Sequence, residues 1–148
     1  MTAQGENILA YLERAITSRE HTATEAAVEY GTEWYYDDGL VLARHEDDMV
    51  ATGSQDFLER PQGEHIALND PASVLRRCAA DRKALALYTE TVAIRDKSTV
   101  TLQHAQGRGV RPDPCVLDDW SRAQREAAVM LPLIQLLAEG YGWTEGER

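Results

Sequence analysis

The sequence has only two cysteines among its 148 residues, Cys78 and Cys115, and no Cys-x-x-Cys pair. Two cysteines cannot build the disulfide framework of small secreted domains, and Cys78 has the helical spacing of a buried thiol. The sequence also lacks the roughly 20 uninterrupted apolar residues of a membrane span, and it begins without the basic and apolar regions of a signal peptide. We therefore expect a cytoplasmic protein that makes no contact with a membrane.

Basic residues are in deficit: 15 Lys and Arg stand against 25 Asp and Glu, which gives a formal net charge of −10. Such a surface repels phosphate backbones and acidic membranes, so direct binding to nucleic acid is disfavoured. The charge serves solubility, or it forms an acidic surface for a basic partner, including mimicry of nucleic acid. The length and the 43% content of hydrophobic residues are those of one domain spanning residues 1–148.

Apolar residues recur at helical spacing in three segments, at about residues 7–30, 71–97 and 119–139. Gly31 ends the first segment, whereas Asp70 and Pro71 have the types of an N-cap and a first helical residue for the second. Asp118 or Asp119 is expected to cap the third. Pro132 lies inside this third helix and predicts a kink or two abutting helices.

Between the first two helices, residues 34–52 change to the period of two that is typical of strands. Asp37-Asp38-Gly39 is a turn signal, and residues 40–45 and 49–52 read as further strands. Residues 61–63 predict a break, residues 65–68 are too few for an independent helix, and residues 107–114 predict a linker. The fold class is therefore α+β and mainly α, with three helices packed together and a small antiparallel β-hairpin or three-stranded meander.

The segment from Glu64 to about Lys83 resembles domain of unknown function 6221, a family of small proteins from actinobacteria and their phages. Weaker similarity lies in the tryptophan-led hairpin at residues 34–52 and in the leucine-rich residues 131–138. The resemblance implies an actinobacterial or actinophage origin, and the family has no known activity to transfer.

Two groups of residues could bind a metal, and neither has suitable spacing. His45 is followed by three carboxylates, Glu46 to Asp48, which alternate between faces on a strand and are solvated at a turn. The resemblance implies a zinc site, because many family members carry a Cys-x-x-Cys pair before a Pro-Cys, but this chain keeps only Pro114-Cys115. Without that pair, His104 and Cys115 cannot complete a tetrahedral site, and we expect no metal and no other cofactor.

Catalytic motifs are also missing. The sequence has no nucleophile elbow, and its Gly107-x-Gly109 lacks the strand and helix of a phosphate loop. His65 beside Glu64 could act as a general base, although a histidine that bonds a carbonyl or caps a helix is more common. No catalytic residue is therefore assigned. The candidate interaction or functional residues are Trp34, Tyr36, His45, His65 and Asp70.

The preferred function is that of a non-enzymatic interaction protein, a phage or mobile-element accessory factor that binds another protein through an acidic or aromatic surface. One alternative is a small metal-dependent or histidine/carboxylate hydrolase that uses His45, His65 and neighbouring carboxylates. A second is an acidic nucleic-acid mimic, which requires carboxylates in two rows. Residues 130–137 are apolar on more than one side, which favours a homodimer through the terminal helix.

Overall fold

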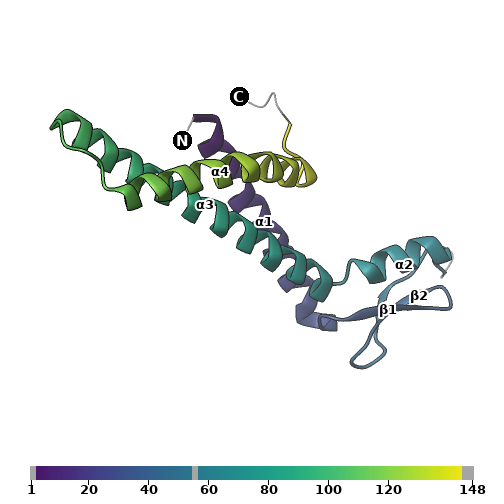
Figure 1. Ribbon diagram of the computed structural model, residues 1–148. Helices are drawn as coiled ribbons and strands as arrows, with labels where there is room; N and C mark the ends of the chain where they lie inside the picture. Colours follow the sequence, from purple (N-terminus) through teal and green to yellow (C-terminus); the bar gives the residue numbers. More distant parts are fainter. Residues whose placement is uncertain (1–2, 55–56, 145–148) are drawn as a thin grey trace. The chain divides into compact units, whose positions relative to one another are not determined.

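The protein, described by a computed structural model for residues 3–54 and 57–144, consists mainly of helices with one small antiparallel sheet (Figure 1). The expected α+β, mainly α class is confirmed. The described part of the chain contains no helix that is both long and apolar enough to cross a membrane. The elements follow in the order α1 (Ala3–Tyr30), β1 (Trp34–Asp37), β2 (Leu40–Ala43), β3 (Met49–Ala51), α2 (Arg60–Leu68), α3 (Pro71–Gly107) and α4 (Pro114–Gly140).

The chain divides into two compact units. The helical unit contains the chain up to Glu13 and from Asp81 onward, and the sheet unit contains Arg14–Ala80. Helices α1 and α3 each run without a break from one unit into the other. The expectation of a single domain over residues 1–148 therefore stays a prediction.

The helical unit has a core made where α1, α3 and α4 turn their apolar faces inward. Positions three or four residues apart on a helix share one face, so each helix contributes a short stripe to this core. Burying each large aliphatic side chain contributes about 1.5–3 kcal/mol relative to exposure. The buried members of the core are Ile8, Leu12, Leu85, Tyr88, Val92, Ala127, Ile134 and Ala138.

The segment after α4 folds back onto the helical unit. Gly142 has a φ of 96°, which glycine adopts without steric cost, and the Trp143 N–H donates to the Ala138 carbonyl at 2.9 Å. The Trp143 ring then meets the Tyr11 ring edge to face, with centroids 4.9 Å apart. Tyr141 completes this closure, because its hydroxyl donates to the Asp81 carboxylate at 2.6 Å.

The sheet unit contains a meander of three antiparallel strands in the order β1-β2-β3. Asp38 and Gly39, both with positive φ, form the two-residue turn that joins β1 to β2. The register places Tyr36 opposite Val41. A register shift between Val41 and Leu42 marks an irregularity where β3 pairs with β2. Three strands are therefore present where the sequence predicted either a hairpin or a meander.

Helix α2 is the main departure from the sequence-based expectation, because residues 61–63 were expected to break the chain. Pro61 lies in the first turn of the helix, where its missing N–H needs no acceptor. Gly63 is buried, and a Cβ at this position would collide with the Tyr36 ring. The glycine thus allows α2 to lie close to β1 and is not a breaker here.

The longer helices also extend beyond the expected bounds. Thr99 and Thr101 donate their hydroxyl protons to carbonyls four residues earlier, so these weak helix formers are accommodated within α3. Helix α4 begins at Pro114, with Asp113 as its N-cap instead of Asp118 or Asp119. It continues as one helix through Pro132, which is exposed, so that the freed backbone carbonyl can be hydrated.

Two leucines of α3 test this account of the helical core. Leu85 is 5% exposed, and Leu85→Ala should lower the free energy of unfolding by about 2–5 kcal/mol because it leaves a cavity. Leu87 is 57% exposed, and Leu87→Ala should change stability by no more than about 0.5 kcal/mol. Urea denaturation measures both. Equal costs for the two variants would contradict the assigned buried face.

The homodimer stays a prediction, and the exposed apolar residues of α4 allow it to be tested. Val129, Leu133 and Leu136 are exposed on α4 at spacings that place them on one face. If two copies meet through this face, Leu133→Glu should convert the dimer to a folded monomer. Light scattering with circular dichroism measures mass and folding together, and a monomeric mass for the unaltered protein would remove the dimer.

Candidate functional site

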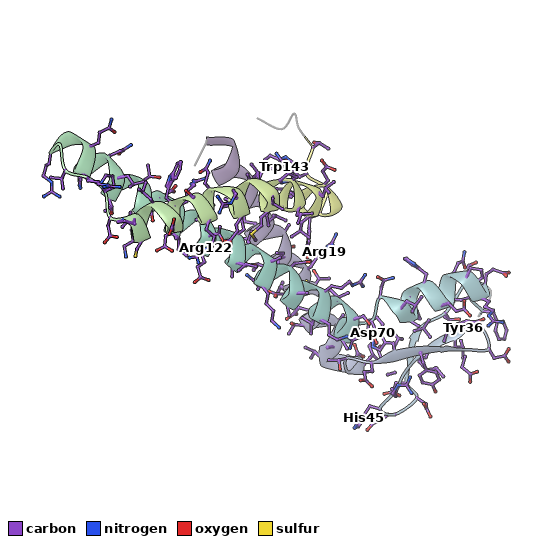
Figure 2. All side chains as sticks on the ribbon, in the orientation of Figure 1. Arg19, Tyr36, His45, Asp70, Arg122 and Trp143 are labelled. Atoms are coloured by element: carbon purple, nitrogen blue, oxygen red, sulfur yellow. The ribbon has the colours of Figure 1, made fainter. Side chains whose placement is uncertain are left out.

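Asp70 joins the start of α3 to the first strand of the sheet. Its side chain is buried, and Figure 2 labels it at the beginning of the helix. One carboxylate oxygen accepts the Ser73 N–H at 2.7 Å, and the other accepts the Trp34 N–H at 3.3 Å. A backbone bond from the Ala72 N–H to the Thr32 carbonyl, 2.9 Å long, lies beside this pair. The predicted N-cap is therefore confirmed and has a second role in positioning β1.

The charge of Asp70 is stabilised by its hydrogen bonds. Burial by itself raises the pKa of this carboxyl group, since it penalises the charged form. Hydrogen bonds from Ser73 and from the Trp34 amide, together with the positive charge of Arg76, outweigh burial and lower the pKa below its ordinary value. The folded protein therefore favours the carboxylate form.

The outer edge of β1 can be deduced from the alternation of hydrogen bonds. The Arg44 N–H donates to the Glu33 carbonyl, so this pair exchanges bonds across the ladder. By alternation Tyr35 bonds to β2 through its backbone, whereas Trp34 and Tyr36 direct theirs away from β2. Asp70 takes the outer N–H of Trp34. For the outer N–H and carbonyl of Tyr36, the described residues supply no hydrogen-bond partner.

An open groove of about 720 Å³ runs beside this edge. One wall is β1 with the following turn, and the other is a single face of α2, whose lining residues recur at helical spacing. Tyr36, labelled in Figure 2, belongs to the strand wall. The groove is lined by Trp34, Tyr35, Tyr36, Asp37, Asp38, Arg60, Glu64, Ala67 and Leu68.

The groove is lined by both apolar and acidic side chains. Leu68 is 73% exposed and lines the groove together with the aromatic side chains of β1. Asp37, Asp38 and Glu64 supply three carboxylates, against a single guanidinium. Arg60 is 2.7 Å from Glu64 and so neutralises one of them. This arrangement suits a ligand with apolar and basic groups.

His45 lies at a different place in the sheet unit, on the turn after β2 (Figure 2). It lines a cavity of about 540 Å³ beside the end of α1, and its Nδ1 is 3.5 Å from Glu46. Glu29 also lines this cavity and raises the pKa of Tyr30 through a hydrogen bond and its negative charge. The cavity is acidic and open to solvent, as expected for a solvated turn.

The structure does not bring the two candidate histidines together. His65 is exposed on α2 and lines neither the cavity of His45 nor the groove. Its backbone carbonyl accepts a hydrogen bond from the Asn69 amide at 2.8 Å. Among residues 3–54 and 57–144, no three His, Cys, Asp or Glu side chains are placed so that they could hold a metal ion. Of the five candidates, Trp34, Tyr36 and Asp70 gather around β1, and the histidines lie elsewhere.

The α2 residues that line the groove were not predicted from the sequence. Arg60, Glu64 and Leu68 are four residues apart, which is the signal for one helical face. This signal was hidden by Pro61 and Gly63, which favoured a break over a helix. The strand wall was recognised through Trp34 and Tyr36.

Comparison with known proteins finds a match to one protein family. The model of a family described as a family of unknown function, DUF6221, matches residues 5–142. The similarity covers most of the chain and includes every candidate residue named from the sequence. No curated protein and no solved structure matches the chain significantly.

The lowered pKa of Asp70 predicts a pH dependence of stability. A carboxyl whose pKa is lower when folded stabilises the protein fully above its unfolded pKa of about 3.9, and this contribution disappears as the pH falls through the folded pKa. Asp70→Asn keeps a good N-cap but removes the charge. The difference in free energy of unfolding between the two proteins should therefore be larger at neutral pH than in acid.

Urea denaturation across this pH range measures the effect. Asp113→Asn is the matched control, because it makes the same substitution at the exposed N-cap of α4. If Asp70→Asn differed from the unaltered protein by the same amount at neutral and acid pH, the assigned role of the carboxylate would be wrong.

Proposed function

The chain belongs to the DUF6221 family of unknown function, and we propose that it is a small, acidic, non-enzymatic interaction protein that binds a basic segment of another protein. The groove between β1 and α2 is the proposed binding site. We further propose that the protein is an accessory factor of actinobacterial or actinophage origin and that it acts in the cytoplasm.

The observation that carries this proposal is the exposed apolar surface inside the acidic groove. Protein interfaces place apolar and aromatic side chains at their centre and polar groups at their rim. The groove offers both kinds of group, since Leu68 and Trp34 are apolar and Asp37 and Asp38 are acidic. The net charge of −10 adds a long-range attraction for basic partners, which raises the rate of encounter.

The groove also supports binding better than catalysis. A hydrolase that uses His45 and His65 requires one cleft that gathers both histidines, and each lies outside the groove. The cavity beside α1 contains His45 without His65. Carboxylates at the groove surround apolar side chains, whereas a nucleic-acid mimic needs two rows at the spacing of phosphates. A basic, partly apolar segment could use the aromatic side chains of β1, the exposed Leu68 and the carboxylates of the groove together.

Affinity capture from an actinobacterial lysate, followed by mass spectrometry, tests this function. Leu68→Glu should reduce capture of the specific partner by about tenfold or more, because it places a charge at an apolar contact. Leu87→Glu is the matched control, since Leu87 is also exposed but is not among the residues that line the groove. It should capture as well as the unaltered protein.

Salt provides a second measurement on the same samples. Capture should weaken as ionic strength rises, because salt screens the attraction between exposed charges. The proposal fails if no protein is captured specifically, or if the captured partner is retained equally by the Leu68→Glu variant.

A further inference from the structure

Along the outer edge of β1, beside the groove, backbone groups have no hydrogen-bond partner among residues 3–54 and 57–144. By the alternation of the ladder, the Tyr36 N–H and carbonyl and the Trp34 carbonyl point away from β2. An edge strand with unpaired groups is a template for another strand. We propose that the partner segment binds in extended form and adds to the sheet as a fourth strand along β1. This inference rests on the proposed function and specifies the conformation of the partner.

The structure also limits the register of the added strand. Asp70 already accepts the Trp34 N–H, so the edge is closed to a guest carbonyl at that end of β1. At the other end, Asp38 and Gly39 turn the chain into β2. Tyr36 is left between these two limits as the residue that can both donate to and accept from a guest. The added strand is therefore short and centred on Tyr36.

Helix α2 supplies the specificity that backbone pairing lacks. Side chains of an extended segment alternate in direction, so every second one can enter the groove. Leu68 and Ala67 form an apolar contact for such a side chain, and Glu64 lies one turn earlier on the same wall. Asp37 and Asp38 lie at the far end of the edge. The fitting segment thus has an apolar residue near Leu68 and lysine or arginine near the carboxylates.

The charge of the groove favours a segment of another protein, and not a second copy of this chain, as the strand that binds along β1. A second copy carries the same net charge of −10 and the same Asp37 and Asp38, so repulsion between like charges opposes its approach to this edge. A basic segment replaces this repulsion with attraction. The occupant is therefore an extended, basic segment of another protein.

Peptides selected from a random phage-displayed library on the immobilised full chain serve as the probe. Selected peptides should be enriched in lysine and arginine, and their affinity should fall about tenfold when an N-methyl group replaces an N–H that bonds to β1. Because a strand directs successive N–H groups to opposite sides, the sensitive positions should alternate with insensitive ones. Binding should also shift the Tyr36 amide resonance and slow its hydrogen exchange.

The affinity of the selected peptides is also measured for the variants Leu68→Glu and Leu87→Glu. Only Leu68→Glu should bind them more weakly. The inference is overturned if no peptide is selected, if N-methylation is tolerated at every position, or if consecutive positions are sensitive, as for a helical ligand. An unchanged Tyr36 amide would overturn it as well. In each of these cases, a lysate partner that still depends on Leu68 would leave the proposed function standing without strand addition.

Discussion

The sheet unit depends on one buried carboxylate. Asp70 uses one oxygen for the first turn of α3 and the other for the first residue of β1. A buried charge is costly unless it is hydrogen-bonded, and here both oxygens have N–H donors. The helix start and the strand start are thereby fixed to each other, although they lie far apart in the sequence. Together with the backbone bond from the Ala72 N–H to the Thr32 carbonyl, this pair of bonds fixes where β1 begins beside α3.

The groove exists because α2 lies close to one side of the sheet without covering the outer edge of β1. Gly63 permits this approach, since any side chain there would collide with the Tyr36 ring. The same helix leaves Leu68 exposed, and the turn leaves Asp37 and Asp38 exposed. The strand edge, the apolar side chain of Leu68 and the carboxylates of Asp37 and Asp38 therefore line the same groove.

Much of this architecture could be predicted from the sequence. The stripes of α1, α3 and α4, the turn at Asp38-Gly39 and the cap at Asp70 are local signals, and local patterns report local structure. Helix α2 could not be predicted in this way, because the role of Gly63 depends on Tyr36, a residue of another element. For the same reason Trp34 and Tyr36 were named as candidates, but the wall formed by Arg60, Glu64 and Leu68 was not. His45 and His65 were named for their chemistry, but the structure places them apart, and His65 lines neither the cavity of His45 nor the groove.

The most direct test is amide hydrogen exchange along β1 in the free protein, measured by nuclear magnetic resonance. The account predicts an alternating pattern, in which Trp34 is protected by Asp70, Tyr35 is protected by its pairing with Leu42, and Tyr36 exchanges fast. Asp70→Ala should then remove the protection of Trp34 while leaving that of Tyr35. A Tyr36 amide as protected as that of Tyr35 would mean that the edge is already paired, and it would contradict the central claim that β1 is open to a partner.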